Sequence, residues 1–279
     1  MSFGGGGGGG GGHGRGGRGR GGAGGGVSCG GYLPRDPNPD ADLRLYCFHH
    51  AGGAASSFTD WQERLGPRIS VLPVQLPGRE GRARCARITR LARLVEEIDD
   101  VLGSDPRGPF AFYGHSMGAL LAYALCLRRL RAGRSLPAAL LVGAFGPPDR
   151  TPDFELVVDL PDEELARWLV GLGGMSPVLL GYPAWLAAAA ALTRDDLKAC
   201  RSYRHAEDTE PLPVPVHVFR GADDPLSAGG EEGWARSTSA SCEVHEVAGG
   251  HLFAYAPEFG RDAVHPFRRV LAEGLPSPL

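Results

Sequence analysis

The chain has 279 residues, a formal net charge of −3, 44 glycines and six cysteines. Residues 1–34 hold three arginines and no acidic residue, so the remainder carries −6, which argues against a broad nucleic-acid surface on the folded part. The longest apolar stretch, around Trp185–Leu192, is too short to span a bilayer, and the N-terminus has no secretory signal, so we expect a cytoplasmic protein that does not bind membranes.

Glycine dominates the beginning of the chain. Residues 4–31 are nearly all glycine, with Arg15, Arg18 and Arg20 between them. A segment with so few apolar side chains cannot bury enough surface to offset the entropy lost on ordering. We therefore predict a disordered Gly/Arg-rich tail over residues 1–40. Such tails can bind RNA, but three arginines make a weak, salt-sensitive site, so an RNA-associated role is a distant alternative.

Residues 41–275 are predicted to form one α/β domain. The apolar residues of Ile88–Leu102 follow helical spacing. Short apolar runs are typical of strands and occur at Leu43–Phe48, Ile69–Leu76, Pro109–Tyr113, Ala138–Ala144, Val214–Phe219 and Cys242–Val247. This alternation predicts an α/β fold with a mostly parallel central sheet and helices on both faces.

The alternation is interrupted between residues 147 and 203. One helix is expected to begin near Pro161 with an acidic first turn, and an alanine-rich helix is expected over Ala184–Leu192. The breaker-rich stretch Gly171–Pro177 separates them. We predict a helical insertion that forms a lid over the active site; the alternative is that these helices only pack on the sheet.

A G-x-S-x-G motif, Gly114–Gly118, lies between the strand that ends at Tyr113 and a helix-forming run that begins at Ala119. Strand, tight turn and helix are the context of a nucleophile elbow. The two glycines let neighbouring chain pass close to the turn, and the strained Ser116 presents its hydroxyl clear of the sheet. The N–H of Met117 lies at the helix start, where N–H groups have no partner. We predict Ser116 as the nucleophile and Met117 as one oxyanion-hole donor.

A serine hydroxyl needs a base, and the base needs an orienting acid. In this fold they are expected downstream, at the ends of later strands, where loops share one edge of the sheet. Asp223 and Asp224 follow the strand that ends at Phe219. We choose Asp224 as the acid because the residue before a proline is held extended, and Asp223 is the alternative.

Our choice for the base is His251, because it alone follows a strand through a Gly-Gly pair. His217 and His245 lie inside strands and are expected to fill the core or the surface, and His205 and His265 lack the same setting.

The second oxyanion donor is expected in the loop after the first strand, where Gly52 and Gly53 allow backbone N–H groups to face a substrate. Ala51 is the predicted donor. His49 and His50 invite a metal-site interpretation together with His251, but adjacent residues seldom bind one ion and no carboxylate or cysteine spacing supports it. We therefore expect no metal ion and no cofactor in this site.

The six cysteines show no C-x-x-C pair and no short repeating spacing. Cys47 and Cys126 lie in apolar runs and are predicted to be small core residues. A domain of this size does not need disulfides, so we expect free thiols.

Several motifs together resemble those of a known family: Phe48–Phe58, Gln75–Glu80, Gly114–Gly118, Gly221–Pro225 and Gly249–Phe253. They look like the motifs of type II thioesterases, α/β-hydrolases that edit acyl groups on polyketide and nonribosomal-peptide assembly lines. The medium-chain acyl-carrier-protein hydrolases of fatty-acid synthesis are similar. The resemblance covers about residues 41–272 and includes Leu160–Leu165 in the lid and Cys200–Tyr203 in its exit helix.

The resemblance implies Ser116 as nucleophile, Asp224 as acid, His251 as base, and Ala51 and Met117 as oxyanion donors. It also implies an acyl thioester on the phosphopantetheine arm of an acyl or peptidyl carrier protein. Composition and spacing alone indicate only a serine hydrolase, so a carboxylesterase or lipase is the alternative function.

The chain departs from the family at two places. His49 stands where the family often has proline, and the Gly/Arg tail is foreign to it. Carrier proteins are typically acidic. Arg87, Arg90 and Arg93 could form a basic docking face on a helix, or simply a solvated surface.

Overall fold

The computed structural model describes Met1 and residues 30–103, 106, 108–150, 155–226, 231–256 and 264–273. Within these residues, six strands form one sheet in the order β2-β1-β3-β4-β5-β6, and all neighbours are parallel. The strands are β1 (Leu43–Phe48), β2 (Ile69–Pro73), β3 (Phe110–His115), β4 (Leu140–Gly143), β5 (Val216–Gly221) and β6 (Cys242–Val247). The predicted α/β class with a parallel sheet is confirmed.

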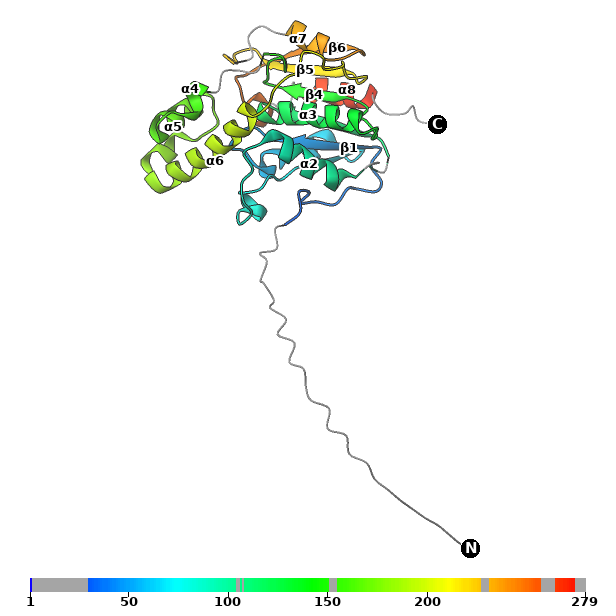
Figure 1. The fold of residues 1–279 in the computed structure, drawn as a ribbon, viewed down its shortest axis with the longest axis horizontal. Coiled ribbons are helices and arrows are strands. Elements are labelled where there is room, and N and C mark those ends of the chain that lie inside the picture. Colours follow the sequence, from blue (N-terminus) through cyan, green and yellow to red (C-terminus); the bar gives the residue numbers. More distant parts are fainter. Residues whose placement is uncertain are drawn as a thin grey trace.

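Helices cover both faces of this sheet (Figure 1). Side chains of α2, α3 and α7 belong to the hydrophobic cluster on one face, and those of α1 and α8 belong to the cluster on the other. The bounds are α1 (Trp61–Leu65), α2 (Leu91–Leu102), α3 (Met117–Arg131), α7 (Glu231–Arg236) and α8 (Val264–Glu273). Short 3-10 turns occur at η1 (Ala55–Phe58), η2 (Glu80–Arg82), η3 (Pro177–Gly181) and η4 (Phe253–Tyr255).

The central strand β3 shows why its sequence is apolar throughout. Successive side chains of a strand point to opposite faces, so Phe112 packs in the α2–α3 cluster and Tyr113 in the α1–α8 cluster. Every residue of β3 is buried because both faces carry helices. The strand leads directly to Ser116, so the core fixes the position of the candidate nucleophile.

A buried ion pair fixes α3 against α2. Asp99 on α2 accepts hydrogen bonds from Arg129 (2.8 Å) and Arg128 (3.0 Å) on α3, and the side chains of Asp99 and Arg129 are fully buried. Because a buried charge without its partner is strongly unfavourable, this contact holds the register of the helix that begins at the candidate nucleophile.

The boundaries of several elements differ from those predicted. β2 ends at Pro73. Val74 still donates to the carbonyl of Cys47 on β1, but Gln75 leaves the sheet and donates to the carbonyl of Tyr32. α2 begins only at Leu91.

Residues 30–40, which the sequence analysis assigned to the tail, contact the body. The Tyr32 side chain is 5% exposed, donates to Glu97 at 2.7 Å and lies under the guanidinium of Arg82. An aromatic ring can pack where the preceding glycines offer nothing to bury. Residues 2–29, to which the predicted disorder and RNA association apply, lie outside the described residues.

A helical segment, the insertion, lies between β4 and β5. It contains α4 (Glu155–Val158), α5 (Asp162–Gly171), η3 and α6 (Pro183–Arg201). Pro161 immediately precedes α5, and the first turn of α5 is acidic as expected. α6 has 19 residues and extends well beyond the predicted Ala184–Leu192, reaching from the outer end of the insertion to the body (Figure 1).

Among the described cysteines, the expectation of free thiols is wrong at Cys85. Cys47, Cys126, Cys200 and Cys242 are free, but Cys85 is in a disulfide. Cys85 lies in an irregular segment, where spacing in the sequence says little about which thiols meet.

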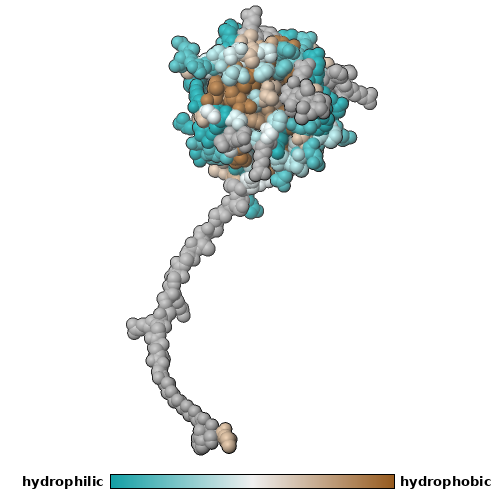
Figure 2. Space-filling view, turned by 90° about the vertical axis from the view of Figure 1, so that its right-hand side faces the viewer, coloured by the Kyte–Doolittle hydropathy of each residue, from teal (hydrophilic) through white to brown (hydrophobic). Residues whose placement is uncertain are grey.

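None of the helices in the described ranges is both long enough and apolar enough to cross a membrane. Figure 2 views the body from the side away from the insertion, where the larger apolar area lies left of centre and much of the remaining coloured surface is hydrophilic.

Candidate active site

Ser116 lies in the sharp turn between β3 and α3, with φ 54° and ψ −118°. This is an unfavourable region for a residue with a Cβ. A Cβ at Gly114 would lie 2.0 Å from the Gly118 carbonyl oxygen, and one at Gly118 would lie 2.1 Å from the Phe48 oxygen. Both glycines are therefore required by close backbone contacts, and the second contact brings the end of β1 against the start of α3.

The structure brings Ser116, His251 and Asp224 together. The Ser116 Oγ lies 3.0 Å from His251 Nε2, and His251 Nδ1 lies 3.0 and 3.1 Å from the two Asp224 carboxylate oxygens. Asp224 is 4% exposed, so its charge acts on the imidazole with little solvent between them. This arrangement can draw a proton from the serine hydroxyl onto the imidazole and stabilise the resulting cation.

The neighbouring Asp223 is directed elsewhere. It is exposed, and its backbone N–H donates to the Gly249 carbonyl at 3.0 Å, while Asp224 Oδ1 also accepts from the Leu226 N–H at 2.9 Å. The loop after β5 is thus tied to the loop after β6, and Asp224 is the member of the pair that contacts His251.

Sequence reasoning missed His115, which contacts the backbone of the base His251. Its Nε2 lies 2.7 Å from the carbonyl oxygen of His251, and its Nδ1 lies 2.7 Å from the Tyr113 hydroxyl. A carbonyl only accepts, so Nε2 carries the proton and Nδ1 accepts from Tyr113. Burial lowers the pKa of His115 well below its usual value, so the ring stays neutral in this role. Its position inside G-x-S-x-G is the only sequence signal.

The predicted oxyanion donors Ala51 and Met117 both line the cavity that contains Ser116 and His251. Met117 is the first residue of α3, so its N–H has no acceptor within the helix. Ala51 lies in the loop after β1 that the close contact of Gly118 with Phe48 brings against this helix start. The two N–H groups thus come from segments that meet beside Ser116.

A buried ion pair clamps the loop that contains Ala51. Asp196 on α6 accepts from both terminal nitrogens of Arg79 at 2.7 Å, and its Oδ2 also accepts from the Gly52 N–H at 2.8 Å. Arg79 in turn donates to the Gly53 carbonyl at 3.2 Å. The Arg79 and Asp196 side chains are only 5% and 3% exposed. The insertion helix and the Pro77–Glu80 segment therefore set the position of this loop together.

Sequence reasoning also missed Asp196. Its signal was a carboxylate on the apolar stripe of a helix, beside Thr193, Leu197 and Cys200, where a charge needs a buried partner. The missing information was which segment supplies the cation, and only the tertiary structure contains it.

His49 and His50 follow the end of β1. His49 Nδ1 donates to the His50 carbonyl at 2.8 Å, and burial lowers the pKa of each imidazole to about 3. Both rings are consequently neutral; His49 is buried, whereas His50 is partly exposed and lines the pocket that contains Ser116 and His251.

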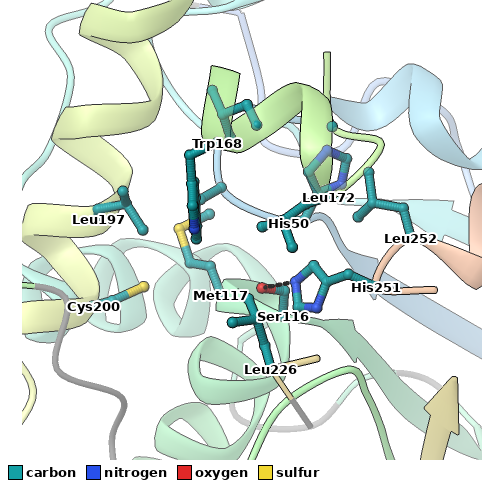
Figure 3. Close-up of a pocket in the computed structure, with 13 residues that line it drawn as sticks. His50, Ser116, Met117, Trp168, Leu172, Leu197, Cys200, Leu226, His251 and Leu252 are labelled. Atoms are coloured by element: carbon teal, nitrogen blue, oxygen red, sulfur yellow. Dashed lines mark hydrogen bonds between the residues drawn. The ribbon is translucent and has the colours of Figure 1, made fainter. Parts of the chain in front are cut away.

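An apolar pocket opens above the Ser116–His251 pair (Figure 3). The space between its atoms is about 450 Å³, its open mouth included. Figure 3 shows Leu197 and Cys200 on one side of the Ser116 hydroxyl and Leu252 on the other. The apolar lining comes from Trp168, Leu169, Leu172, Leu197, Cys200, Leu226 and Leu252. Such a lining suits a hydrocarbon chain attached to the group that reacts at Ser116.

The three arginines considered for docking are in different environments. Arg87 pairs with Asp195 at 2.9 Å, and Arg93 pairs with Glu96 and Glu97 on its own helix. Arg90 is exposed at the start of α2. The uniform basic face considered in the sequence analysis is thus partly neutralised.

Comparison with known proteins adds independent information. A family model described as a thioesterase domain matches residues 43–265. The chain is 33% identical to the gramicidin S biosynthesis protein GrsT of Aneurinibacillus migulanus, over 82% of this chain and 89% of that protein. It is 32% identical to the thioesterase PikA5 of Streptomyces venezuelae, over 81% of each. The structure of the RedJ thioesterase from prodiginine biosynthesis in Streptomyces coelicolor shares 33% identity with a TM-score of 0.76, over 86% of this chain and 94% of that one.

Proposed function

Because the chain belongs to the thioesterase domain family, we propose that it is a type II editing thioesterase that removes acyl groups from the phosphopantetheine arms of carrier proteins. The assembly lines served make polyketides or nonribosomal peptides, as the similarity to GrsT and PikA5 supports. The observation that carries the proposal is the chain of 3.0 Å contacts from Ser116 through His251 to Asp224 beneath an apolar pocket.

In the proposed acylation step, Ser116 Oγ attacks the thioester carbonyl while His251 Nε2 takes the hydroxyl proton. Asp224 accepts the Nδ1–H hydrogen bond, which fixes the tautomer and stabilises the imidazolium. The N–H groups of Ala51 and Met117 hold the oxyanion of the tetrahedral intermediate. His251 then returns the proton to the departing sulfur, which leaves the acyl group on Ser116 as an ester.

Hydrolysis of this ester repeats the same sequence with water as the nucleophile. His251 removes a proton from water, the oxyanion forms again at Ala51 and Met117, and the proton passes to Ser116 as the acid is released. His115 and Asp196 are positioning residues, since one holds the backbone of the base and the other holds the oxyanion loop.

The Cys200 thiol also lines the pocket, but it is not suited to act as the nucleophile in place of Ser116. Burial raises the pKa of Cys200, so this thiol remains protonated and is a poor nucleophile.

We also propose that the reaction takes place in the cytoplasm. The four free cysteines of the described ranges support this location, although Cys85 is in a disulfide.

The test compares wild type, Ser116→Ala and the exposed-serine control Ser56→Ala on an acyl-loaded carrier protein. We expect Ser116→Ala to lose a factor of about 10⁴ to 10⁶ in kcat and Ser56→Ala to lose nothing. Hydrolysis by Ser116→Ala at the wild-type rate contradicts the proposal.

A matched pair of substrates separates the thioesterase from a carboxylesterase or lipase. Acyl-CoA and an oxygen ester with the same acyl chain are compared by kcat/KM, and we expect the thioester to be preferred. The leucines and Trp168 of the pocket also favour a medium-chain fatty acyl substrate as a second candidate. A series of acyl carriers with graded chain length decides between this candidate and short biosynthetic acyl groups.

A further inference from the structure

Three potential metal ligands converge on one face of the sheet, away from the candidate active site. His217 lies on β5, and Glu243 and His245 lie on the adjacent strand β6. In the parallel register His217 is opposite Glu243, and Phe219 is opposite His245. Residues that are opposite one another, or two apart in a strand, share a face, so all three side chains project to the side that α8 covers.

The ligand atoms are spaced as a metal ion requires. His217 Nδ1 and His245 Nε2 are 3.2 Å apart, and Glu243 Oε2 is 3.9 Å from each. A triangle with these sides has a circumscribed radius of about 2.1 Å, so one point lies about 2.1 Å from all three atoms. Zinc binds imidazole nitrogen at about 2.0–2.1 Å and carboxylate oxygen at about 2.0–2.2 Å. At this point the ion would lie in the plane of the three atoms. A small movement of the half-exposed Glu243 side chain toward the two nitrogens gives the ligand spacings of about 3.3–3.4 Å of a tetrahedral zinc site.

The surroundings hold the two rings in place and leave a path from solvent. Both imidazoles are buried. The His245 ring stacks on the Phe219 ring with a centroid distance of 4.7 Å, and the Phe219 ring stacks in turn on the Phe267 ring at 3.7 Å. The Glu243 side chain is 49% exposed on the edge strand. A buried pair of rings with a partly exposed carboxylate allows an ion to enter from the edge and a water to complete four-coordination.

We propose that His217, Glu243 and His245 form a zinc site that joins β5 to the edge strand β6. Two imidazoles and one carboxylate are a ligand set that zinc accepts, and imidazole ligands favour late first-row metals over magnesium or calcium. The role follows from the place of the site: the loops that follow these two strands hold Asp224 and His251, and the three ligands lie upstream of both loops. The ion would hold together the strands from which acid and base project.

The test uses zinc alone as the probe and the full chain without an affinity tag. Calorimetric titration in a buffer that does not bind metals compares wild type, Glu243→Gln and His245→Phe. The phenyl ring keeps the stacking on Phe219 but removes the nitrogen ligand. Glu246→Gln is the matched control, because Glu246 is an exposed acid of the same strand whose partner is Arg220.

We expect wild type to bind one zinc ion per chain with a dissociation constant in the micromolar range or below. Glu243→Gln weakens binding by about tenfold and His245→Phe by about a hundredfold or more, and the control stays within twofold of wild type. The proposal is overturned if wild type binds no stoichiometric zinc, or if Glu243→Gln and His245→Phe bind it as tightly as wild type. If His245→Phe fails to fold by circular dichroism, the comparison of Glu243→Gln with Glu246→Gln decides alone.

Discussion

Gly52→Ala tests how the loop of Ala51 is held beside α6. Gly52 has φ +79°, and a Cβ there would lie 2.4 Å from Thr193 Oγ1, about 1 Å inside ordinary contact. The same Cβ would lie 3.5 Å from the Thr193 Cβ, an ordinary van der Waals distance. The clash therefore comes from the hydroxyl, and Thr193→Ala should remove it.

The expected loss of kcat/KM has two causes, the clash with the Thr193 hydroxyl and the positive φ at residue 52. Pushed away from α6, the loop loses the Gly52 contact to Asp196 and misaligns the Ala51 N–H, and losing one oxyanion donor costs about 10² to 10³ in kcat. We expect a fall of about a hundredfold in kcat/KM for Gly52→Ala. Adding Thr193→Ala restores at least tenfold, leaving the positive-φ penalty of about 1–2 kcal/mol for an alanine.

The assay is steady-state hydrolysis of an acyl-CoA, with the released thiol detected by a colorimetric reagent. Thr193→Ala alone is the reference for the double variant, and near-wild-type activity is expected of it. The reasoning is refuted if Gly52→Ala keeps its kcat/KM within twofold of wild type. It is also refuted if the double variant is no more active than Gly52→Ala.

Three further outcomes are expected. Asp196→Asn leaves the buried Arg79 without its counter-charge, so we expect it to lower the free energy of unfolding by about 3–5 kcal/mol, measured by urea denaturation. It should also lower kcat more than it changes KM, and an unchanged kcat contradicts the role of this ion pair in holding the oxyanion loop. The low pKa of His49, about 3, means that the unfolded chain binds a proton below pH 6.5 that the folded chain does not. Stability therefore falls as the pH drops from 7 to 5, and His49→Gln reduces that slope by up to about 1.4 kcal/mol per pH unit; equal slopes in urea melts would contradict this. Trp168→Ala enlarges the pocket and shifts the preferred acyl chain to greater length, measured as the ratio of kcat/KM for long and short acyl-CoA, and an unchanged ratio places the acyl chain elsewhere.

The sequence was most informative where a feature depends on neighbouring residues. The apolar run before Gly114, the two glycines and the helix after Ser116 are local, so the elbow could be predicted in detail. The positions of Asp224 and His251 could be predicted equally well. Each follows the end of a strand, and parallel strands present their carboxyl ends at one edge of the sheet.

Contacts between distant segments could not be predicted. Arg79 and Asp196 are 117 residues apart, and His115 reaches a backbone carbonyl 136 residues away. Apolar periodicity reports which face of a helix is buried but not what lies opposite. The same limit explains why His217 and His245 were interpreted only as filling groups: their proximity depends on the register of β5 against β6.

The most direct test of the proposed mechanism is the identity of the residue that becomes acylated. Rapid mixing with an acyl thioester, acid quench and peptide mass mapping locate the covalent intermediate. We expect the acyl group on the peptide that contains Ser116, and no adduct in Ser116→Ala. An acyl group found on Cys200 during turnover, or undiminished adduct in Ser116→Ala, would contradict a serine nucleophile activated by His251 and Asp224.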